Sequence, residues 1–218
     1  VPQCITYLAE LDGSEGSQGS EGSKRSRESK RSKKQIVVKF ATRYGKEVHE
    51  FLAANGCAPK LHYCEPLFDD ASYPSPVDNA EGSSGLHLGP MVMVVMDYVR
   101  ENRQGARLPP QARQDVERPL KMLHSAGYVL GDLRRANLIV DEQQKVWFID
   151  FDWSGYYWSE NSYPHDGDGG QEQRVERQLC ARYPVRMSSI NGMWASGMEP
   201  LALIQPQHDL DMLEKLFD

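Results

Sequence analysis

The 218-residue chain has few cysteines, no long apolar run and no uniform charge. Its four cysteines are far apart and form no CxxC pair, which argues against a disulfide scaffold or a zinc ribbon and favours a reduced, intracellular setting. No apolar stretch approaches the ~20 residues that cross a bilayer, and the first nine residues lack the features of a signal peptide. We therefore expect no membrane partner, and one ordinary domain or a small two-lobed unit.

Acidic residues are in excess, but the charge is unevenly distributed. The net charge is -6, yet residues 13–34 contain only Gly, Ser, Glu, Gln, Lys and Arg and carry +4, which leaves -10 on the other 196 residues. This stretch predicts a disordered low-complexity insertion. Its basic half, Lys24–Lys34, also fits an import or nucleic-acid patch, but such short matches often arise by chance, and nucleic acid is not an expected partner.

Apolar patterning predicts an α+β fold with most strands in the first half. Strands are expected at Ile5–Leu11, Ile36–Phe40, Leu61–Glu65 and Met91–Val99, and a β-hairpin from Asn137–Val140 and Lys145–Ile149. Helices are expected at Tyr44–Asn55, Pro110–Ala126 and His208–Phe217. A proline at position 119 predicts a kink or a late start in the second helix.

The clearest chemical pattern lies around the hairpin. Asp132 is followed five residues later by Asn137 and eighteen residues later by Asp150, and the last two flank the hairpin. The three side chains should therefore converge. Mg2+ prefers such oxygen ligands and shares them with nucleotide phosphates, while a carboxylate free of metal can accept the proton of an attacking hydroxyl. Any one of the three alone would be read as an ordinary turn residue.

Together these residues resemble the protein kinase-like superfamily, which carries D-x-x-x-x-N followed by D-F-x at this spacing. Leu130-Gly131-Asp132 stands where protein kinases have His-Arg-Asp, and Asp150-Phe151-Asp152 where they have Asp-Phe-Gly. The Gly-Asp-Leu form is also similar to the catalytic loop of choline and aminoglycoside kinases. The resemblance covers roughly residues 36–155. The nearest likeness is to kinase-like proteins of filamentous fungi, which have a segment similar to Tyr44-Gly45-x-Glu47-Val48-His49 after the lysine strand and a late His-Asp, here His208-Asp209, before a terminal helix.

The resemblance implies a two-lobed fold, with an N-terminal lobe over residues 1–99 and a helical C-terminal lobe over 100–218. It implies that Asp132 is catalytic and orients the acceptor hydroxyl, and that Asn137 and Asp150 hold Mg2+, with ATP as phosphate donor. Within the strand expected at Ile36–Phe40, the run Val37-Val38-Lys39 is similar to the V-A-I-K strand of the family. Lys39 would bind the α- and β-phosphates.

Lys39 needs a carboxylate partner if it is buried in its apolar strand. Glu47 is the expected partner, because it lies one turn before Phe51, beside the apolar stripe of the following helix. The family places its Lys–Glu pair there. Glu50 is the alternative, but on the helical period it faces away from the stripe.

Residues 92–99 resemble the strand and hinge that join the two kinase lobes. The resemblance puts Met96 at the gatekeeper position and the backbone of Asp97 to Val99 on the adenine edge. An ordinary buried strand would explain the same apolar residues.

Several family features are missing from the chain. No Gly-rich phosphate loop is recognisable, so we expect an N-terminal lobe that lacks its first strand and this loop, both of which would precede Val1. Leu130 and Asp152 replace the family's His and Gly, and no Ala-Pro-Glu follows. Asp209 would be the buried aspartate that ties the C-terminal lobe to the catalytic loop, with Asp211 as alternative.

The function we expect is that of an ATP- and Mg2+-dependent kinase, cytoplasmic or nuclear, that phosphorylates protein serine or threonine. A small-molecule alcohol is the second acceptor class, favoured by the Gly-Asp-Leu form and the missing Ala-Pro-Glu. A different class is a pseudokinase that binds nucleotide as an interaction module. Retention of Lys39, Asp132, Asn137 and Asp150 argues against that class, because a scaffold has no physical need for all four.

Overall fold

The computed structural model describes residues 4–12, 33–67, 91–102, 108–109, 111–159, 180–187 and 194–218. Most of the predicted low-complexity insertion lies outside these ranges. Its last two residues do not belong to an insertion, because Lys33 and Lys34 already form part of a β-strand and pair with Asp12 and Leu11. The alternation of apolar and polar residues that predicts a strand is absent at these two positions, because both side chains are charged and exposed.

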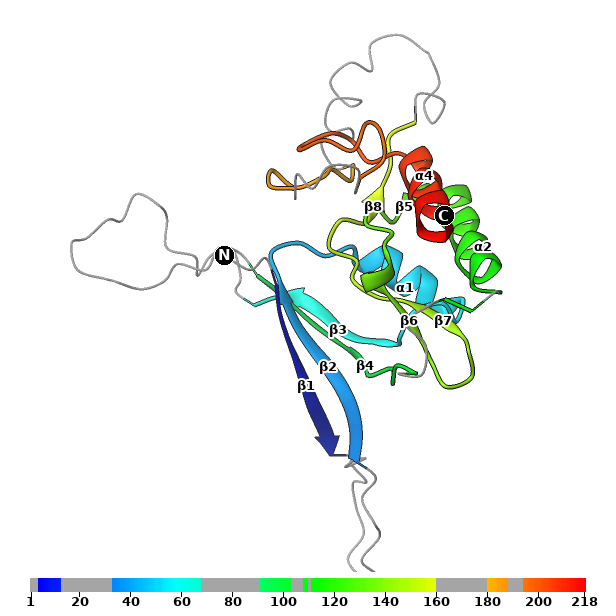
Figure 1. Ribbon diagram of the computed structural model, residues 1–218. Coiled ribbons are helices and arrows are strands. Elements are labelled where there is room, and N and C mark those ends of the chain that lie inside the picture. The colour runs from blue at the N-terminus through cyan, green and yellow to red at the C-terminus, as the bar shows by residue number, and fades with distance from the viewer. Residues whose placement is uncertain are drawn as a thin grey trace, which may run out of the picture.

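A four-stranded antiparallel sheet with the order β1-β2-β4-β3 accounts for most of the first half (Figure 1). Its strands are β1 (Cys4–Asp12), β2 (Lys33–Ala41), β3 (Leu61–Pro66) and β4 (Val92–Asp97). All four expected strands are present, with ends that differ by a few residues. Lys39 of β2 is paired with Thr6 and Val94. Because alternate residues share a face, Val37 lies on the same side of the sheet as Lys39.

Three helices and two small strand pairs complete the described chain. The helices are α1 (Lys46–Ala54), α2 (Ala112–Ser125) and α4 (Pro206–Phe217). β5 (Tyr128–Val129) pairs with β8 (Gly155–Tyr156), and β6 (Leu138–Val140) pairs with β7 (Val146–Phe148) after a 3-10 turn, η2 (Arg135–Asn137). The predicted α+β class and the predicted hairpin are confirmed. None of the described helices combines the length and apolar composition that a membrane crossing requires.

The main hydrophobic core lies beneath the helices and includes side chains from all three of them. α1 contributes Val48 and Leu52, and α2 contributes Leu120 and Leu123, all fully buried. α2 continues through Pro119, which is itself buried. A smaller cluster beside the sheet consists of Cys64, Val94 and Met96.

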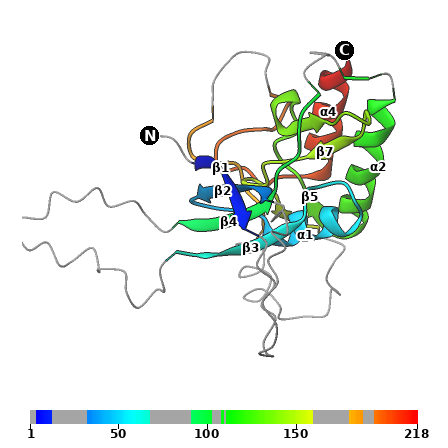
Figure 2. The same cartoon turned by 90° about the horizontal axis from the view of Figure 1, so that it is seen from below.

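Three backbone hydrogen bonds fasten the sheet and α1 to the second half of the chain. They join Phe148 N to Cys57 O (2.8 Å), Asn102 N to Val140 O (2.8 Å) and Gly45 N to Phe151 O (2.9 Å). The contact at Gly45 requires glycine, because a Cβ there would lie 2.1 Å from the Ser154 hydroxyl oxygen and 2.7 Å from its carbonyl oxygen. The segment after β7 is thereby held against the start of α1, and its Asp150 and Asp152 contact Lys39 of β2. Figure 2 shows the three helices gathered to one side of the four strands of the sheet.

The core of α2 gives the first testable prediction. Leu120→Ala should lower the free energy of unfolding by about 2–5 kcal/mol, because it leaves a cavity in a fully buried site. Urea denaturation at pH 7 measures this value. Leu8→Ala is the matched control, because Leu8 is 57% exposed and its loss should change stability by less than about 0.5 kcal/mol. Equal losses in the two variants would contradict the assigned core.

Candidate active site

Asp132 lies in a loop between β5 and η2 that a buried carboxylate of α4 holds in place. The Asp209 side chain accepts hydrogen bonds from the backbone N–H groups of Leu130 (2.9 Å) and Gly131 (2.8 Å). His124 Nε2, at the end of α2, lies 3.0 Å from the same carboxylate. With 1% exposure, Asp209 has lost its water, so these three groups provide its solvation.

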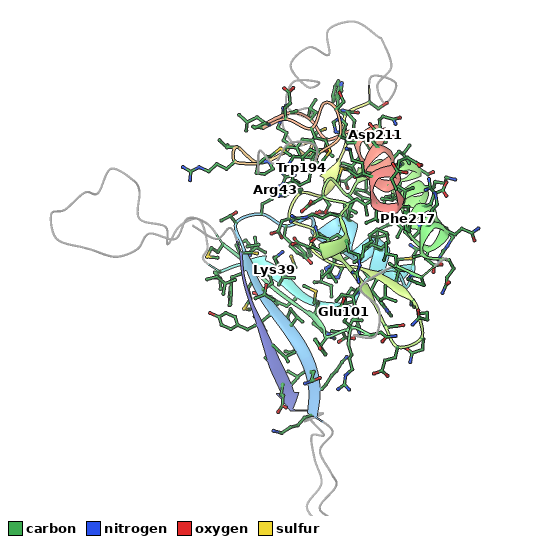
Figure 3. All side chains as sticks on the ribbon, viewed as in Figure 1. Lys39, Arg43, Glu101, Trp194, Asp211 and Phe217 are labelled. Carbon is green, nitrogen blue, oxygen red and sulfur yellow. The ribbon has the colours of Figure 1, made fainter. Side chains whose placement is uncertain are left out.

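The structure selects Asp209 over Asp211 for this role. Asp211 lies on α4 well away from Lys39 (Figure 3), and its carboxylate accepts a hydrogen bond from Gln207 Nε2 at 2.6 Å. The same loop explains why glycine precedes Asp132. Gly131 has φ +82°, and a Cβ there would lie 2.7 Å from Ile204 Cδ1, so a larger residue would be strained on both counts.

The Asp132 carboxylate is buried and contacted on both oxygens. Asn137 Nδ2 donates to Oδ2 and to the Asp132 backbone oxygen, both at 2.9 Å. Arg134 Nε lies 3.0 Å from Oδ1 as an ion pair, but its N–H is not aligned for a hydrogen bond. The pKa of Asp132 is raised to about 6, because burial and the charge of Asp150 together outweigh the lowering effects of Arg134 and Asn137.

The hairpin brings Asp150 next to this loop, as predicted. Ile149 N donates to Asn137 O at 3.0 Å, so the residue before Asp150 is paired with the residue before β6. Asp150 itself has φ +66°, a conformation that costs energy in residues other than glycine but that aspartate tolerates better than most. The strained backbone turns the chain directly after β7 and brings Asp150 to the sheet. Such strain often marks a functional position.

Lys39 is held by two carboxylates that follow β7. Its Nζ lies 2.8 Å from Asp150 Oδ1 and 2.6 Å from Asp152 Oδ1. The residue is 4% exposed. Burial alone would lower the pKa of this amine, but Asp150 and Asp152 outweigh burial and raise its pKa above the ordinary value.

The predicted pair of Lys39 and Glu47 does not form in the described structure. Glu47 and the alternative Glu50 are both exposed on α1. The buried residues of this helix are Val48, His49 and Leu52, so its inward face is centred nearer His49 than the apolar pattern indicated. The apolar stripe used for the prediction did not include His49, and this rotated Glu47 toward the sheet.

His49 is the side chain of α1 that reaches this region. Its ring stacks on Phe151, with centroids 4.5 Å apart and planes at 17°. Nδ1 bonds the Tyr44 hydroxyl at 2.7 Å and Nε2 bonds the Pro59 carbonyl at 2.8 Å. The pKa of His49 is lowered to about 4, because desolvation and the charge of nearby Lys39 together outweigh the hydrogen bond to Pro59. The ring is therefore neutral near pH 7 and acts as a fixed support beneath Phe151.

A cavity of about 190 Å3 lies beside Lys39 and Asp150. Its walls combine apolar side chains from the sheet and the hairpin with the chain that follows β4; they are Thr6, Val37, Lys39, Pro59, Met96, Asp97, Tyr98, Val99, Ile139, Ile149 and Asp150. A larger hollow of about 710 Å3 beside α2 includes none of the predicted site residues.

The segment after β4 offers backbone groups to this cavity. The N–H groups of Asp97 and Tyr98 are already bonded to the carbonyls of Lys60 (3.0 Å) and Gln35 (3.3 Å). Within the described ranges, the N–H and carbonyl of Val99 have no hydrogen-bond partner. The prediction that the backbone of Asp97 to Val99 binds a ligand is thus narrowed to Val99, because the Asp97 N–H is bonded to Lys60 and the Val99 backbone has no partner among the described residues.

Negative charge exceeds positive charge at the centre of the site. Lys39 serves two carboxylates, and burial together with the charge of Asp150 raises the pKa of Asp152 to about 6 although Lys39 lowers it. A further cation would relieve this excess. The described residues contain no group of three or more His, Cys, Asp or Glu side chains that would enclose a metal by themselves. A metal bound here would need ligands from outside the protein, which is the usual mode for Mg2+ beside phosphates.

Asn137 and Asp150 fit such a metal in chemistry. The Asn137 amide nitrogen is engaged by Asp132, which leaves the amide oxygen as the atom available for coordination. Asp150 keeps one carboxylate oxygen beyond the one that contacts Lys39.

Sequence reasoning missed three polar residues of this region: Asp152, His49 and Arg134. Asp152 was treated only as a replacement for glycine, although an acidic residue two positions after Asp150 was a visible signal. His49 and Arg134 carried no periodic signal, because their roles depend on contacts with Phe151 and Asp132 that only the fold creates.

No protein-family model matches the chain, and no curated protein is similar enough to be matched. The chemistry of the site therefore rests on its own geometry.

The anchor of the Asp132 loop is testable through stability. Asp209→Ala should lower the free energy of unfolding by about 3–5 kcal/mol, because two buried backbone N–H groups and His124 lose their acceptor. Urea denaturation with circular dichroism measures it. Asp211→Ala removes a partly exposed carboxylate from the same helix together with its hydrogen bond to Gln207, and should change stability by no more than about 1 kcal/mol. The anchor assignment is wrong if both variants behave alike.

His49 should give the protein a specific acid sensitivity. Its pKa is about 4 in the folded protein against an ordinary value of 6.5, so the unfolded chain binds an extra proton between these pH values. This proton favours unfolding, and stability should fall by up to about 3 kcal/mol as the pH drops from 6.5 to 4.

The comparison variant for this effect is His49→Gln, which keeps hydrogen-bonding groups but cannot titrate. Urea denaturation at pH 7, 5.5 and 4.5 should show a smaller loss in the variant than in the wild type. Parallel pH profiles for the two proteins would exclude His49 as the source.

Proposed function

We propose that the protein is an ATP- and Mg2+-dependent phosphotransferase with a two-lobed kinase-like fold. The observation that carries the proposal is the convergence of Lys39, Asp150 and a mostly apolar cavity on one side of the buried Asp132–Asn137 pair. A lysine beside a cavity suits nucleotide phosphates, and a separate buried carboxylate suits proton transfer. The four free cysteines fit the cytoplasmic or nuclear setting that such a kinase would have.

The adenine base would occupy the cavity between the sheet and the hairpin. Val37 on the sheet side and Ile139 and Ile149 on the hairpin side offer apolar surface to its two faces. The N–H and carbonyl of Val99 supply a donor and an acceptor for its edge. The volume of about 190 Å3 is below the roughly 300–1,000 Å3 of pockets that enclose a whole ligand. The phosphates would therefore extend beyond it along Lys39.

The phosphate end of the site is set by charge. Lys39 places a compact cation beside Asp150, and Asp150 with the Asn137 oxygen would hold Mg2+. When bound, the metal neutralises phosphate charge and orients the transferred group. Lys39 is fixed in place by its carboxylates and so loses little further freedom when a nucleotide binds.

Asp132 would orient the acceptor hydroxyl and take its proton. Asn137 holds Oδ2, and the Asp209 anchor fixes the backbone on its N-terminal side, so the carboxylate is preorganised. Arg134, in contact with Oδ1, adds positive charge next to this group.

Protein serine or threonine is the acceptor we propose first, and a small-molecule alcohol is the second. The observation that favours the second is Gly131, because its positive φ favours glycine directly before Asp132, as in the catalytic loop of the choline and aminoglycoside kinases that this loop resembles. Residues 160–179 and 188–193, where a substrate platform would follow, lie outside the described residues.

The direct test is transfer from γ-labelled ATP with Mg2+ to three acceptors: a mixed protein substrate, a panel of small alcohols including choline and aminoglycosides, and water. Asp132→Asn should lower transfer by about 100- to 10,000-fold while ATP affinity persists, since the carboxylate serves proton transfer. Asp150→Asn should weaken Mg2+-dependent ATP binding as well. Asp211→Asn is the control and should match the wild type.

The acceptor that takes up label decides between the two kinase classes. If wild type binds ATP but transfers label to nothing, the enzyme proposal is wrong and a nucleotide-binding module remains. Absence of both binding and transfer would reject the nucleotide proposal altogether.

A further inference from the structure

We propose that Asp152 is the positioning residue for Lys39, in the place where the kinase resemblance led us to expect Glu47, and that Asp150 is thereby left for metal. The inference rests on the proposed function. It assigns separate tasks to two carboxylates that both contact the same amine.

The contacts of Lys39 single out Asp152. Its Oδ1 is the nearer oxygen, at 2.6 Å against 2.8 Å for Asp150 Oδ1. The Asp152 side chain is also the more buried, with 18% exposure against 31% for Asp150. The carboxylate with more open surface is the better placed to take a second ligand, and the more enclosed one is better suited to a permanent ion pair.

The charges around Lys39 support the same assignment, with Asp152 as the ion-pair partner and Asp150 as the metal ligand. A buried ammonium group needs a carboxylate at all times, because leaving it unpaired costs several kcal/mol. If Asp150 shares its charge with a bound metal, its attraction for Lys39 weakens. Within the described residues, Asp152 is the other carboxylate in contact with Lys39 Nζ, whereas Glu47 is exposed on α1.

Hydrogen bonds hold the backbone on both sides of Asp152, and no charged side chain of α1 takes part in them. The Phe151 carbonyl accepts bonds from Gly45 N (2.9 Å), Ser154 N (3.3 Å) and Ser154 Oγ (2.9 Å). Phe151 itself is fully buried against His49. The carboxylate is therefore presented by a rigid turn.

One consequence distinguishes this arrangement from a lysine held by a helix. Lys39 is tied to the same short segment that carries the metal ligand Asp150, so the phosphate-binding cation and the metal site are set by a single turn.

The test combines a readout that needs no nucleotide with one that does. The full chain is treated with an amine-acylating reagent, and the rate of modification of Lys39 is followed by peptide mass spectrometry, with exposed Lys121 as internal reference. ATP affinity is measured by calorimetry in Mg2+ and in EDTA. The variants are Asp152→Asn, Asp152→Glu, Asp150→Asn and Glu47→Gln, with Glu50→Gln as control.

Asp152→Asn should speed Lys39 acylation about tenfold and weaken ATP binding about tenfold both in Mg2+ and in EDTA, because its effect passes through Lys39. Asp152→Glu should restore part of both. Asp150→Asn should reduce ATP affinity mainly in Mg2+. In a Lys39→Met background, Asp152→Asn should cause no further loss of affinity.

The outcomes separate the inference from the proposed function. If the wild type binds ATP but Asp152→Asn changes neither readout, or if Glu47→Gln releases Lys39 instead, the inference is wrong and the function stands. If the wild type binds no ATP but Asp152→Asn still speeds Lys39 acylation relative to Lys121, the positioning role stands and the nucleotide function fails. If Asp152→Asn raises the acylation rate of all lysines equally, the variant is unfolded and Asp152→Glu takes its place. The inference then holds if Asp152→Glu speeds acylation of Lys39 relative to Lys121, and it is wrong if the ratio of the two rates is unchanged.

Discussion

The buried ammonium of Lys39 is the constraint on which the arrangement of the site depends. A lysine on an otherwise apolar strand cannot stay buried without carboxylates, and β2 itself supplies none on that face. The partners come from residues 111 and 113 positions later in the chain. Satisfying this one charge forces the turn after β7 against the sheet, and the cavity lies where the two meet.

A second buried charge does the same for the loop that carries Asp132. Asp209 lies in the last helix, yet its two oxygens bind the backbone of Leu130 and Gly131. The two constraints meet at the hairpin, because β6 begins beside the Asp132 loop and β7 ends beside Asp150. Core packing of α1, α2 and α4 holds these anchors at fixed distances from each other. Contacts between residues far apart in the sequence therefore position the charged side chains of the site, whereas the helices and the hairpin that carry them form from local sequence.

Most of the helices and strands that carry the site were predictable from local sequence. Alternating or continuous apolar runs located the four strands of the sheet, and a polar turn between two apolar runs located the hairpin. The 3.6-residue period located all three helices, although Pro119 proved to lie inside α2 without ending it. The spacing of Asp132, Asn137 and Asp150 predicted their convergence for a simple reason: a hairpin returns the chain to its starting end.

What failed were statements about which side chains face each other across the fold. Glu47 was placed toward Lys39 by an apolar stripe that omitted His49, and counting the buried histidine rotates the helix enough to expose Glu47. Asp152 was noted but given no partner. Lys33 and Lys34 were assigned to the insertion, because exposed charged residues carry no alternation that would mark them as strand.

By itself, the sequence determined the three helices, the four strands of the main sheet, the hairpin and the α+β class, because periodicity and turn spacing are local properties of the chain. Only the tertiary structure decided that Lys39 pairs with Asp150 and Asp152, and that Asp209 rather than Asp211 anchors the loop. Those outcomes depend on the rotation of each helix about its axis and on contacts between segments more than 70 residues apart. Burial of charge fixes such contacts only once the core has formed.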